Sequence, residues 1–497
     1  MIRLPAYHVT KAEFDGLISI TCSNGQVCTT ADYHEALRFL LDSAGNVPYD
    51  VPRVVWKLDE LINALMVILP DHAVKGLDSD DHRATWSERE MRYRLFLQPG
   101  KFFGLHAGGF GMETTYYELD QFFPEYREMQ SIDDVKAAAE ELVLTAASIG
   151  VKNIKDLKSP VAMIEASGLM EQVYKQLPGT ADIPAGAMEY AEMTDAWGAW
   201  TSAYQIGYWP EVFTYDVASC YPSIAARLPS LDGAKYEYVK KEIPADAKWG
   251  FMKGELTIDP DHPLAWCSPV VAPVGDDVGN PVGVLPGFFT LAQVRYIIRH
   301  GMGNFNLKDG WFVTPQSDKM PFKDVMNQYY QLRKGGDLTS MLCKRVINGL
   351  IGRLGQYIKD EPTPYTNPIY HSTIRNGASL LVGEFIVHNE ITQDELLHVN
   401  TDGIRITRKL SLPDTNGMGK WRSHGQHATI ILAPDKVLEG EACNAMLDAV
   451  RANKRATIYH DTDMWRIAAE QDRYFERYPS TGGDLLKKQY MSQPLVV

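Results

Sequence analysis

The N-terminal part of the chain, to about residue 125, alternates strand-like apolar runs with amphipathic helical runs. The hydrophobic pattern predicts strands over 16–22, 51–58 and 101–107. Apolar residues at helical spacing predict helices over 30–43 and 58–69. Such a mixture is typical of an α/β or α+β module.

Helical periodicity continues over residues 131–178, and Ser131 followed by early acidic residues is typical of a helix N-cap. A strand-rich block broken by Gly and Pro then covers about 204–286. From about Glu439 the pattern predicts helices followed by a polar tail. No internal repeat interrupts this order.

Two helical runs, 322–334 and 338–356, flank a Gly-Gly-Asp break and predict an antiparallel helical hairpin. Arg333 ends the first run. Three residues of the second run follow at intervals of four and therefore share one face, namely Lys344, Asn348 and Gly352. For cations alone, a solvated basic surface is the simpler interpretation.

A length of 497 residues exceeds the usual single core, so two or more domains are expected. With 45% hydrophobic and 23% charged residues, the composition is that of an ordinary globular protein. The net charge of −14 argues by itself against a nucleic-acid partner. A local basic groove can nevertheless coexist with an acidic exterior.

The six cysteines show neither a C-x-x-C pair nor zinc spacing, and no secretory leader opens the chain. We therefore expect a reduced, cytoplasmic protein without structural zinc. The apolar run 61–70 is too short to span a bilayer, and no membrane role is expected.

Two acidic residues stand where chemistry is plausible. A strand-like run ends at Asp216 and leads through a Ser-Cys-Tyr-Pro-Ser turn into a helix. Residues 398–407 read as two short strands with Asp402 at the tip of the turn. A purely structural turn is the simple interpretation, because Asn and Asp-Gly pairs supply the positive φ of tight hairpins. Two carboxylates and a set of cations are, however, the parts that two-metal phosphoryl transfer needs.

In this order the residues resemble the motifs of family B DNA polymerases. Residues 216–223 are similar to motif A, D-x-x-S-L-Y-P-S, and 344–352 to motif B, K-x-x-x-N-S-x-Y-G. Residues 398–403 resemble motif C, Y-x-D-T-D-S, and 419–421 with 431–440 resemble the L-G-x-W and R-x-K-x-Y region. The match covers roughly residues 200–440. The departures from the motifs include Cys220 for Leu, Ile351 for Tyr, Asn400 for Asp, and the lack of a Tyr after Lys436.

The resemblance implies a role for each matching residue. Asp216 and Asp402 would ligate two Mg²⁺ or Mn²⁺ ions together with the Val217 carbonyl, and Lys436 would contact the primer end. The backbone amides of Ser219, Cys220 and Tyr221 would meet the triphosphate, joined by Arg333, Lys344 and Asn348. Tyr221 would be the steric gate under the sugar, and Gly352 would let its helix approach the templating base.

The resemblance also implies an α+β multidomain fold, a right-hand polymerase behind a degenerate ribonuclease-H-like exonuclease domain. The expected domains are 1–130 exonuclease-like, 131–200 connector, 201–321 palm with motif A, 322–358 fingers, 359–432 palm with motif C, and 433–497 thumb and tail. No D-x-E precedes Asp216, so we expect no active proofreading.

The expected function is template-directed DNA synthesis by a compact polymerase of viral type, which would work in the host cytoplasm. Its partners would be primer-template DNA and deoxynucleotides, with room for a replication accessory protein. A polymerase-like scaffold without activity and a specialised, primer-synthesising nucleotidyltransferase are the alternatives. Asp216, Asp402, Lys344 and Tyr221 together favour catalysis, whereas Asn400 and Ile351 keep the scaffold open.

Overall fold

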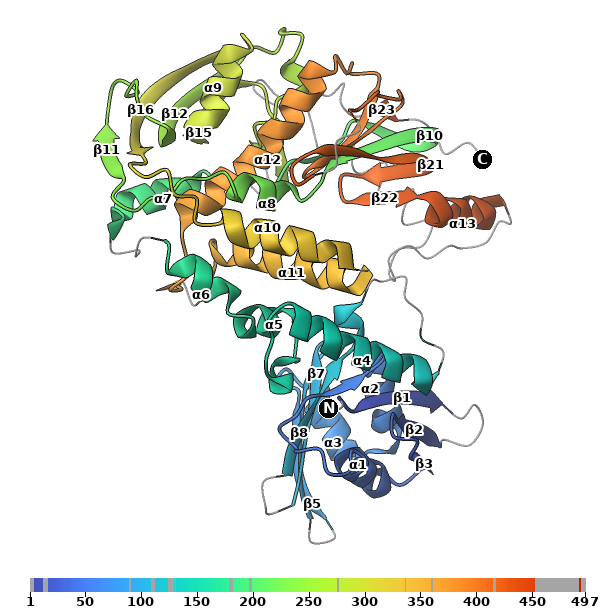
Figure 1. Cartoon of the computed structure of the whole chain (residues 1–497). Helices are drawn as coiled ribbons and strands as arrows, with labels where there is room; N and C mark the ends of the chain where they lie inside the picture. Colours follow the sequence, from blue (N-terminus) through green and yellow to red (C-terminus); the bar gives the residue numbers. More distant parts are fainter. Residues whose placement is uncertain are drawn as a thin grey trace. The chain divides into compact units, whose positions relative to one another are not determined.

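The computed structural model describes residues 4–11, 17–88, 91–108, 112–123, 129, 131–177, 182–195, 199–274, 277–335, 337–358, 361–413, 417–451 and 491–492. Its internal contacts divide the chain into two compact units (Figure 1). The first unit comprises Met1–Val173 and Gln328–Leu350, and the second comprises Tyr174–Asn327 and Ile351–Val497. Most of the predicted thumb, 452–490, lies outside the described residues.

The first unit is built on one mixed sheet of eight strands in the order β3-β2-β1-β4-β8-β7-β6-β5. Strand β4 pairs in parallel with both β1 and β8, and the other neighbours are antiparallel. The strands are β1 (Ala6–Lys11), β2 (Ile18–Cys22), β3 (Val27–Thr30), β4 (Arg53–Val55), β5 (Arg83–Glu88), β6 (Met91–Gln98), β7 (Phe102–Ala107) and β8 (Met112–Glu118). The strands predicted over 16–22 and 101–107 correspond to β2 and β7 and are confirmed. The run predicted over 51–58 contains β4, which covers only Arg53–Val55 because Leu58 already begins α2.

Helices of this unit bury the apolar stripes that the sequence predicted. The helices are α1 (Tyr33–Asp42), α2 (Leu58–Ile68), α3 (Asp71–Leu77), α4 (Ile132–Ser148), α5 (Pro160–Ala166) and α6 (Leu169–Tyr174). Leu37 and Leu40 of α1 and Leu61 and Leu65 of α2 are buried in one core with the sheet. Ser131 caps α4 in a capping box with Asp134, which confirms the predicted helix start.

The predicted helical hairpin consists of α10 (Lys323–Leu332) and α11 (Asp337–Arg353). Residues 328–350 of the hairpin pack with the first unit, where the Tyr329 hydroxyl donates to the Ile149 carbonyl at 3.0 Å. Lys344, Asn348 and Gly352 all lie on α11, where their spacing puts them on one face, and all three are exposed.

The second unit contains a seven-stranded sheet in the order β22-β21-β10-β20-β19-β9, with β23 beside β10. Its strands are β9 (Thr201–Ala203), β10 (Gln205–Val217), β19 (Leu396–Asn400), β20 (Gly403–Ile406), β21 (Trp421–Ala433), β22 (Lys436–Glu439) and β23 (Met491–Ser492). Helix α12 (Pro368–His388) buries Val382, Phe385 and Ile386 in one core with apolar side chains of this sheet. Helix α13 (Gly440–Arg451) packs against β21 and β22, and helices α7 (Ala185–Met193) and α8 (Cys220–Ala225) both contact α12.

A second sheet of the same unit is antiparallel, in the order β11-β16-β12-β15. Its strands are β11 (Lys235–Val239), β12 (Trp249–Ile258), β15 (Gly283–Thr290) and β16 (Gly303–Thr314), and α9 (Leu291–Arg299) packs on it. Two short hairpins pair β13 (Ala272–Val274) with β14 (Asp277–Gly279) and β17 (Tyr357–Ile358) with β18 (Glu361–Pro362). The predicted strand-rich block is thus confirmed, although its strands are divided among the seven-stranded sheet, the four-stranded sheet and the β13–β14 hairpin.

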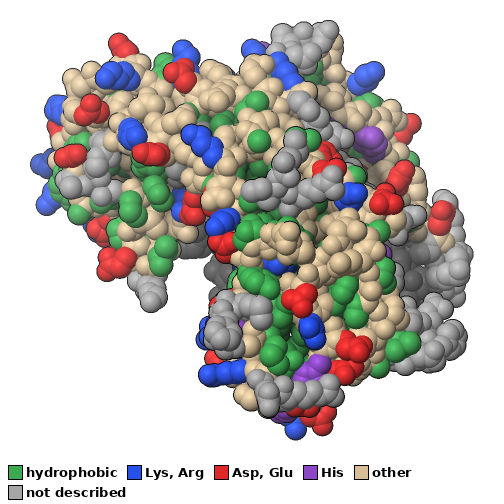
Figure 2. All heavy atoms as spheres, turned by 60° about the horizontal axis from the view of Figure 1, so that its bottom comes forward, with side chains coloured by type: hydrophobic (Ala, Val, Ile, Leu, Met, Phe, Trp, Pro, Cys, Tyr) green, Lys and Arg blue, Asp and Glu red, His purple; other side chains and the backbone are tan. Residues whose placement is uncertain are grey.

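The surface carries both signs of charge. On the face shown in Figure 2, acidic and basic side chains are interspersed and are not sorted by sign. Across the described part of the chain, none of the helices combines the length and the apolar character that a bilayer crossing requires.

Two glycines of the second sheet allow a matched stability test. A Cβ on Gly303 would lie 1.8 Å from the Thr257 carbonyl oxygen, whereas one on Gly287 would meet the Phe289 ring at an ordinary 3.5 Å. We expect Gly303→Ala to lower the free energy of unfolding by about 1–3 kcal/mol, because the backbone must shift. Gly287→Ala should change it by less than about 0.5 kcal/mol. Chemical denaturation measures both, and equal midpoints would contradict the packing described for β12 and β16.

Candidate active site

Strand alternation sorts the residues of β10 and β20 onto two faces of their sheet. Tyr215 and Val217 are buried, and Tyr215 lies in the core that contains Phe385 of α12. Thr214 and Asp216, the alternate residues, therefore point to the opposite face. Asp216 lies opposite Gly403 of β20 and opposite Arg422 of β21. The predicted strand-end carboxylate is thus located between two neighbouring strands.

Asp402 follows a strained residue at the tip of the β19–β20 hairpin. Thr401 has φ +59°, and the Asp402 amide donates to the Asn400 carbonyl at 2.7 Å, which closes a three-residue γ-turn. A positive φ is costly for a β-branched residue. The sequence prediction that Asn and Asp-Gly would supply the positive φ is therefore wrong, since Thr401 supplies it.

Backbone hydrogen bonds fix this turn to the rest of the sheet. The Thr401 amide donates to the Trp200 carbonyl at 2.7 Å. The Val217 amide donates to the Asp402 carbonyl at 3.0 Å. The residue after one candidate ligand is thus bonded directly to the backbone of the other, so the two carboxylates share one rigid frame.

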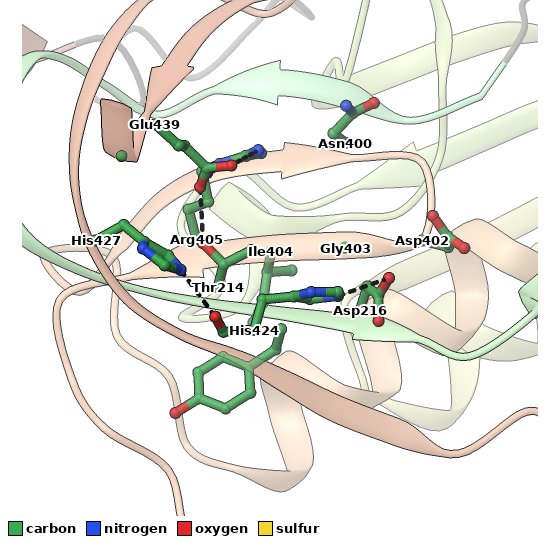
Figure 3. Close-up of a pocket in the computed structure, with 12 residues that line it drawn as sticks. Thr214, Asp216, Asn400, Asp402, Gly403, Ile404, Arg405, His424, His427 and Glu439 are labelled. Carbon is green, nitrogen blue, oxygen red and sulfur yellow. Dashed lines mark hydrogen bonds and ion pairs between the residues drawn. The ribbon is translucent and has the colours of Figure 1, made fainter. Parts of the chain in front are cut away.

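Both carboxylates line one open pocket of about 460 Å³ on this face of the sheet, and they lie toward the same end of it (Figure 3). The pocket is lined by Thr214, Tyr215, Asp216, Asn400, Asp402, Gly403, Ile404, Arg405, His424, His427, Glu439 and Gly440. Asn400, where the family motif has a carboxylate, therefore faces the same space. The prediction that Asp216 and Asp402 form one site is consistent with this geometry.

Asp216 is held by two side chains of β21, the guanidinium of Arg422 and the imidazole of His424. Arg422 donates from Nε to Oδ1 at 2.6 Å and from Nη2 to Oδ2 at 2.9 Å, and His424 Nε2 lies 3.0 Å from Oδ2. Burial opposes ionisation, but the bonds and charges of Arg422 and His424 outweigh it and hold the pKa of Asp216 below its usual range. Asp216 is consequently an anion at neutral pH.

A second ion pair crosses the sheet at the other end of the pocket. Arg405 on β20 donates to both oxygens of Glu439 on β22, at 2.8 and 2.9 Å. Thr214 on β10 donates to Oε1 of the same carboxylate at 2.8 Å. The Arg405 side chain is 15% exposed and that of Glu439 30%. The pair therefore ties three strands together in a largely desolvated setting.

His398 extends this network below the surface. It is fully buried, and its Nε2 lies 2.8 Å from the Pro434 carbonyl and its Nδ1 3.0 Å from Arg405 Nη1. Because a carbonyl only accepts, Nε2 carries the proton and Nδ1 accepts from Arg405. Burial, with the Arg405 charge, lowers the pKa of His398 to about 3. The imidazole is thus a neutral link between β19 and the turn that precedes Lys436.

The residues predicted to meet a nucleotide follow Asp216 directly. Ser219 has φ +51° and precedes α8, whose first residues are Cys220 and Tyr221. Cys220 is buried and Tyr221 is half-buried. Burial raises the pKa of Tyr221 to about 12, despite the opposing charge of Arg375, so its hydroxyl is neutral at physiological pH.

The other predicted residues are distributed over both units. Lys436 begins β22 in the same sheet as the carboxylates but is not among the residues that line the pocket. Gly352 is exposed, and a Cβ there would meet no atom within 4 Å, so the protein itself imposes no need for glycine. Arg333, Lys344 and Asn348 belong to the first unit. Their placement beside the carboxylate pair stays a prediction.

The donor set suits a hard divalent cation. Among the residues that the structure describes, no group of three or more His, Cys, Asp or Glu side chains is arranged to hold a metal ion. Mg²⁺ in nucleotide sites, however, is held by one or two carboxylates plus substrate phosphates and water. Asp216 and Asp402 bring carboxylate oxygens of this kind to the pocket, so they fit ions that arrive with a nucleotide. Val217 is not among the residues that line the pocket, and its carbonyl as a further ligand stays a prediction.

No protein-family model matches the sequence, and no curated protein matches it significantly. In structure, by contrast, the chain matches DNA polymerases, and it has a DNA polymerase fold. One match is phi29 DNA polymerase complexed with primer-template DNA and incoming nucleotide substrates, with TM-score 0.57 and 13% identity over 88% of each chain. The orthorhombic form of that enzyme gives TM-score 0.53 and 13% identity over 88% of this chain and 87% of the other. The post-translocation binary complex of phi29 DNA polymerase with primer-template DNA gives TM-score 0.53 and 13% identity over 88% of this chain and 90% of the other.

The predicted fold class is confirmed at the level of a DNA polymerase fold with mixed α and β structure. Sequence reasoning missed four ionisable residues around the pocket: Arg405, Arg422, His424 and Glu439. An arginine inside the apolar strand GIRI was one available signal, because a charge in such a strand needs a partner. No local sequence pattern indicated that Arg422 and His424 would contact Asp216.

The buried imidazole generates a prediction about acid stability. Between pH 7 and pH 5 an unfolded histidine takes up a proton that His398, with its pKa of about 3, does not bind in the folded state. The wild-type protein should therefore lose about 2 kcal/mol of unfolding free energy through this group. His398→Gln should lose that much less over the same range, measured by urea denaturation at both pH values. His388→Gln, at an exposed site on α12, is the control and should keep the wild-type loss; equal losses in both variants would contradict a neutral His398.

Proposed function

We propose that this protein is a template-directed DNA polymerase that adds deoxynucleotides to a primer 3′ end by two-metal phosphoryl transfer. The observation that carries the proposal is the Asp216–Asp402 pair, which strand β10 and the turn of the neighbouring β19–β20 hairpin present to one pocket in a chain with a polymerase fold. The motif resemblance adds support, because the two carboxylates are those of motifs A and C.

Each residue has a task in this proposal. Asp216 and Asp402, with the Val217 carbonyl, hold Mg²⁺ or Mn²⁺, and the ions when bound lower the charge barrier to attack on the α-phosphate. Lys436 contacts the primer end. Tyr221 lies under the sugar, and Ser219 and Cys220 meet the triphosphate through their amides.

The remaining assignments concern the first unit. Arg333, Lys344 and Asn348 contact the incoming nucleotide from the helical hairpin, and Gly352 lies against the templating base. The eight-stranded sheet is a degenerate exonuclease-like domain without proofreading activity. The absence of D-x-E before Asp216 supports this assignment.

A polymerase-like subunit that binds nucleic acid without catalysis is the second candidate. Asn400 and the Arg422 ion pair on Asp216 favour it, because both reduce the negative charge available to cations. The proposed role of Asp402 distinguishes the two functions.

Primer extension on a primed DNA template with Mg²⁺ or Mn²⁺ tests the proposal. Asp402→Asn should lower the extension rate by roughly 10³-fold or more, equivalent to about 4 kcal/mol, because one metal ligand loses its charge. Asp394→Asn, at an exposed site before β19, is the control and should extend at the wild-type rate. No extension by the wild type, with DNA binding retained in fluorescence anisotropy, would identify the scaffold instead. The same assay also tests the proposed lack of proofreading. A 3′-mismatched primer incubated without nucleotides should stay full length, because the proposed protein does not remove nucleotides from the primer 3′ end.

Sugar selection tests Tyr221 separately. Removing the ring in Tyr221→Ala opens space for a 2′-hydroxyl, so ribonucleotide incorporation relative to deoxynucleotide should rise roughly 10- to 100-fold. Tyr221→Phe keeps the ring and should retain the selectivity. Single-nucleotide insertion kinetics give both ratios. An unchanged ratio in Tyr221→Ala would rule out a steric gate at this position.

A further inference from the structure

The carboxylate of Asp216 is almost fully engaged within the protein. A carboxylate offers about four lone-pair positions to donors or metal ions. Arg422 uses one on each oxygen, at 2.6 and 2.9 Å, and His424 uses a further one on Oδ2, at 3.0 Å. Roughly one position is left for a cation. Binding of a divalent ion at Asp216 therefore requires that at least one of these partners moves away.

Arg422 is placed so that it can move. It lies directly opposite Asp216 in the β10–β21 register, and its side chain is 49% exposed. An exposed arginine can swing on its flexible stem without disturbing the core. A guanidinium also binds phosphate in the same two-pronged manner as it binds carboxylate.

The charges around the pocket favour a nucleotide phosphate as the alternative partner of Arg422. Glu439 is paired with Arg405, and Asp216 is paired with Arg422. Asn400, on the same wall, is neutral. Pairing with Arg422 thus offsets the charge that Asp216 would offer to a bare divalent ion, which weakens the attraction of Asp216 for that ion. A metal–triphosphate complex brings its own negative charge, and its phosphate oxygens can compensate the charge of both the metal ions and the displaced guanidinium.

We propose that Arg422 is a displaceable latch that occupies Asp216 in the free protein and transfers to a phosphate of the metal–nucleotide complex. The latch keeps the affinity for bare divalent ions low and couples metal binding to nucleotide binding. This inference rests on the proposed function, because it assigns Asp216 as a metal ligand. Arg422 is a positioning residue in this scheme, since it acts through Asp216.

Mn²⁺ binding, followed by the electron paramagnetic resonance signal of free Mn²⁺, tests the latch without any turnover. Without nucleotide, Arg422→Gln should bind Mn²⁺ about 10-fold more tightly than the wild type, because the competitor for Asp216 is gone. With a dideoxy-terminated primer-template and the matching deoxynucleotide, this advantage should vanish or reverse. Arg408→Gln, which removes another exposed ion pair of the same unit, should match the wild type throughout.

The outcomes separate the latch from the function on which it rests. If Arg422→Gln gains affinity equally with and without nucleotide, simple charge removal explains the effect and the transfer to phosphate is overturned. If it gains nothing while Asp216→Asn loses Mn²⁺ binding, the latch is overturned but the metal site stands. If Asp216→Asn binds Mn²⁺ as the wild type does, the metal assignment itself is overturned.

Arg422→Lys is a more conservative variant that keeps the test valid if Arg422→Gln does not fold. Lysine keeps the charge but cannot bridge both oxygens of Asp216. Its Mn²⁺ affinity without nucleotide should lie between that of the wild type and that of Arg422→Gln, and its circular dichroism spectrum should match that of the wild type. A wild-type affinity for Arg422→Lys would contradict the two-pronged contact as the source of the competition.

Discussion

The antiparallel pairing of β10 with β20 is the constraint on which the candidate site depends. It places Asp216 opposite Gly403, and Val217 donates to the Asp402 carbonyl. Because side chains alternate along a strand, the same pairing sends Tyr215 and Ile404 into the core with α12. A shift of one residue would exchange the faces and bury the carboxylates. The apolar packing against α12 therefore fixes the register, and the register fixes the chemistry.

Two carboxylates of the pocket above this pairing, those of Asp216 and Glu439, have their charges offset by arginines. Arg405 neutralises Glu439, and Arg422 neutralises Asp216. The two pairs differ in burial, with Arg405 15% and Arg422 49% exposed. Removing one partner of a buried pair leaves a desolvated charge, so the Arg405 pair is suited to holding strands in place. The exposed pair costs less to break and can exchange partners.

The sequence contained the local parts of this structure but not the long-range ones. The cap at Ser131, the hairpin break near Gly336 and the strand ending at Asp216 follow from short-range patterns, and the described residues agree with them. The ion pair between Asp216 and Arg422 joins residues 206 positions apart, and only the β10–β21 register brings them together. The positive φ at Thr401 was equally hidden, because tertiary hydrogen bonds to Trp200 and Val217 outweigh the local preference of the turn.

The turn at Thr401 has a mechanical meaning of its own. A glycine would adopt φ +59° without strain, but it would also allow the tip many other conformations. Threonine, once held in this geometry by the hydrogen bonds to Trp200 and Asp402, has few other accessible conformations. The tip then behaves as a stiff bracket, and the position of the Asp402 carboxylate is set by the covalent chain. In the proposed polymerase, where the cations would arrive with the substrate, the site can in this way keep its shape while empty.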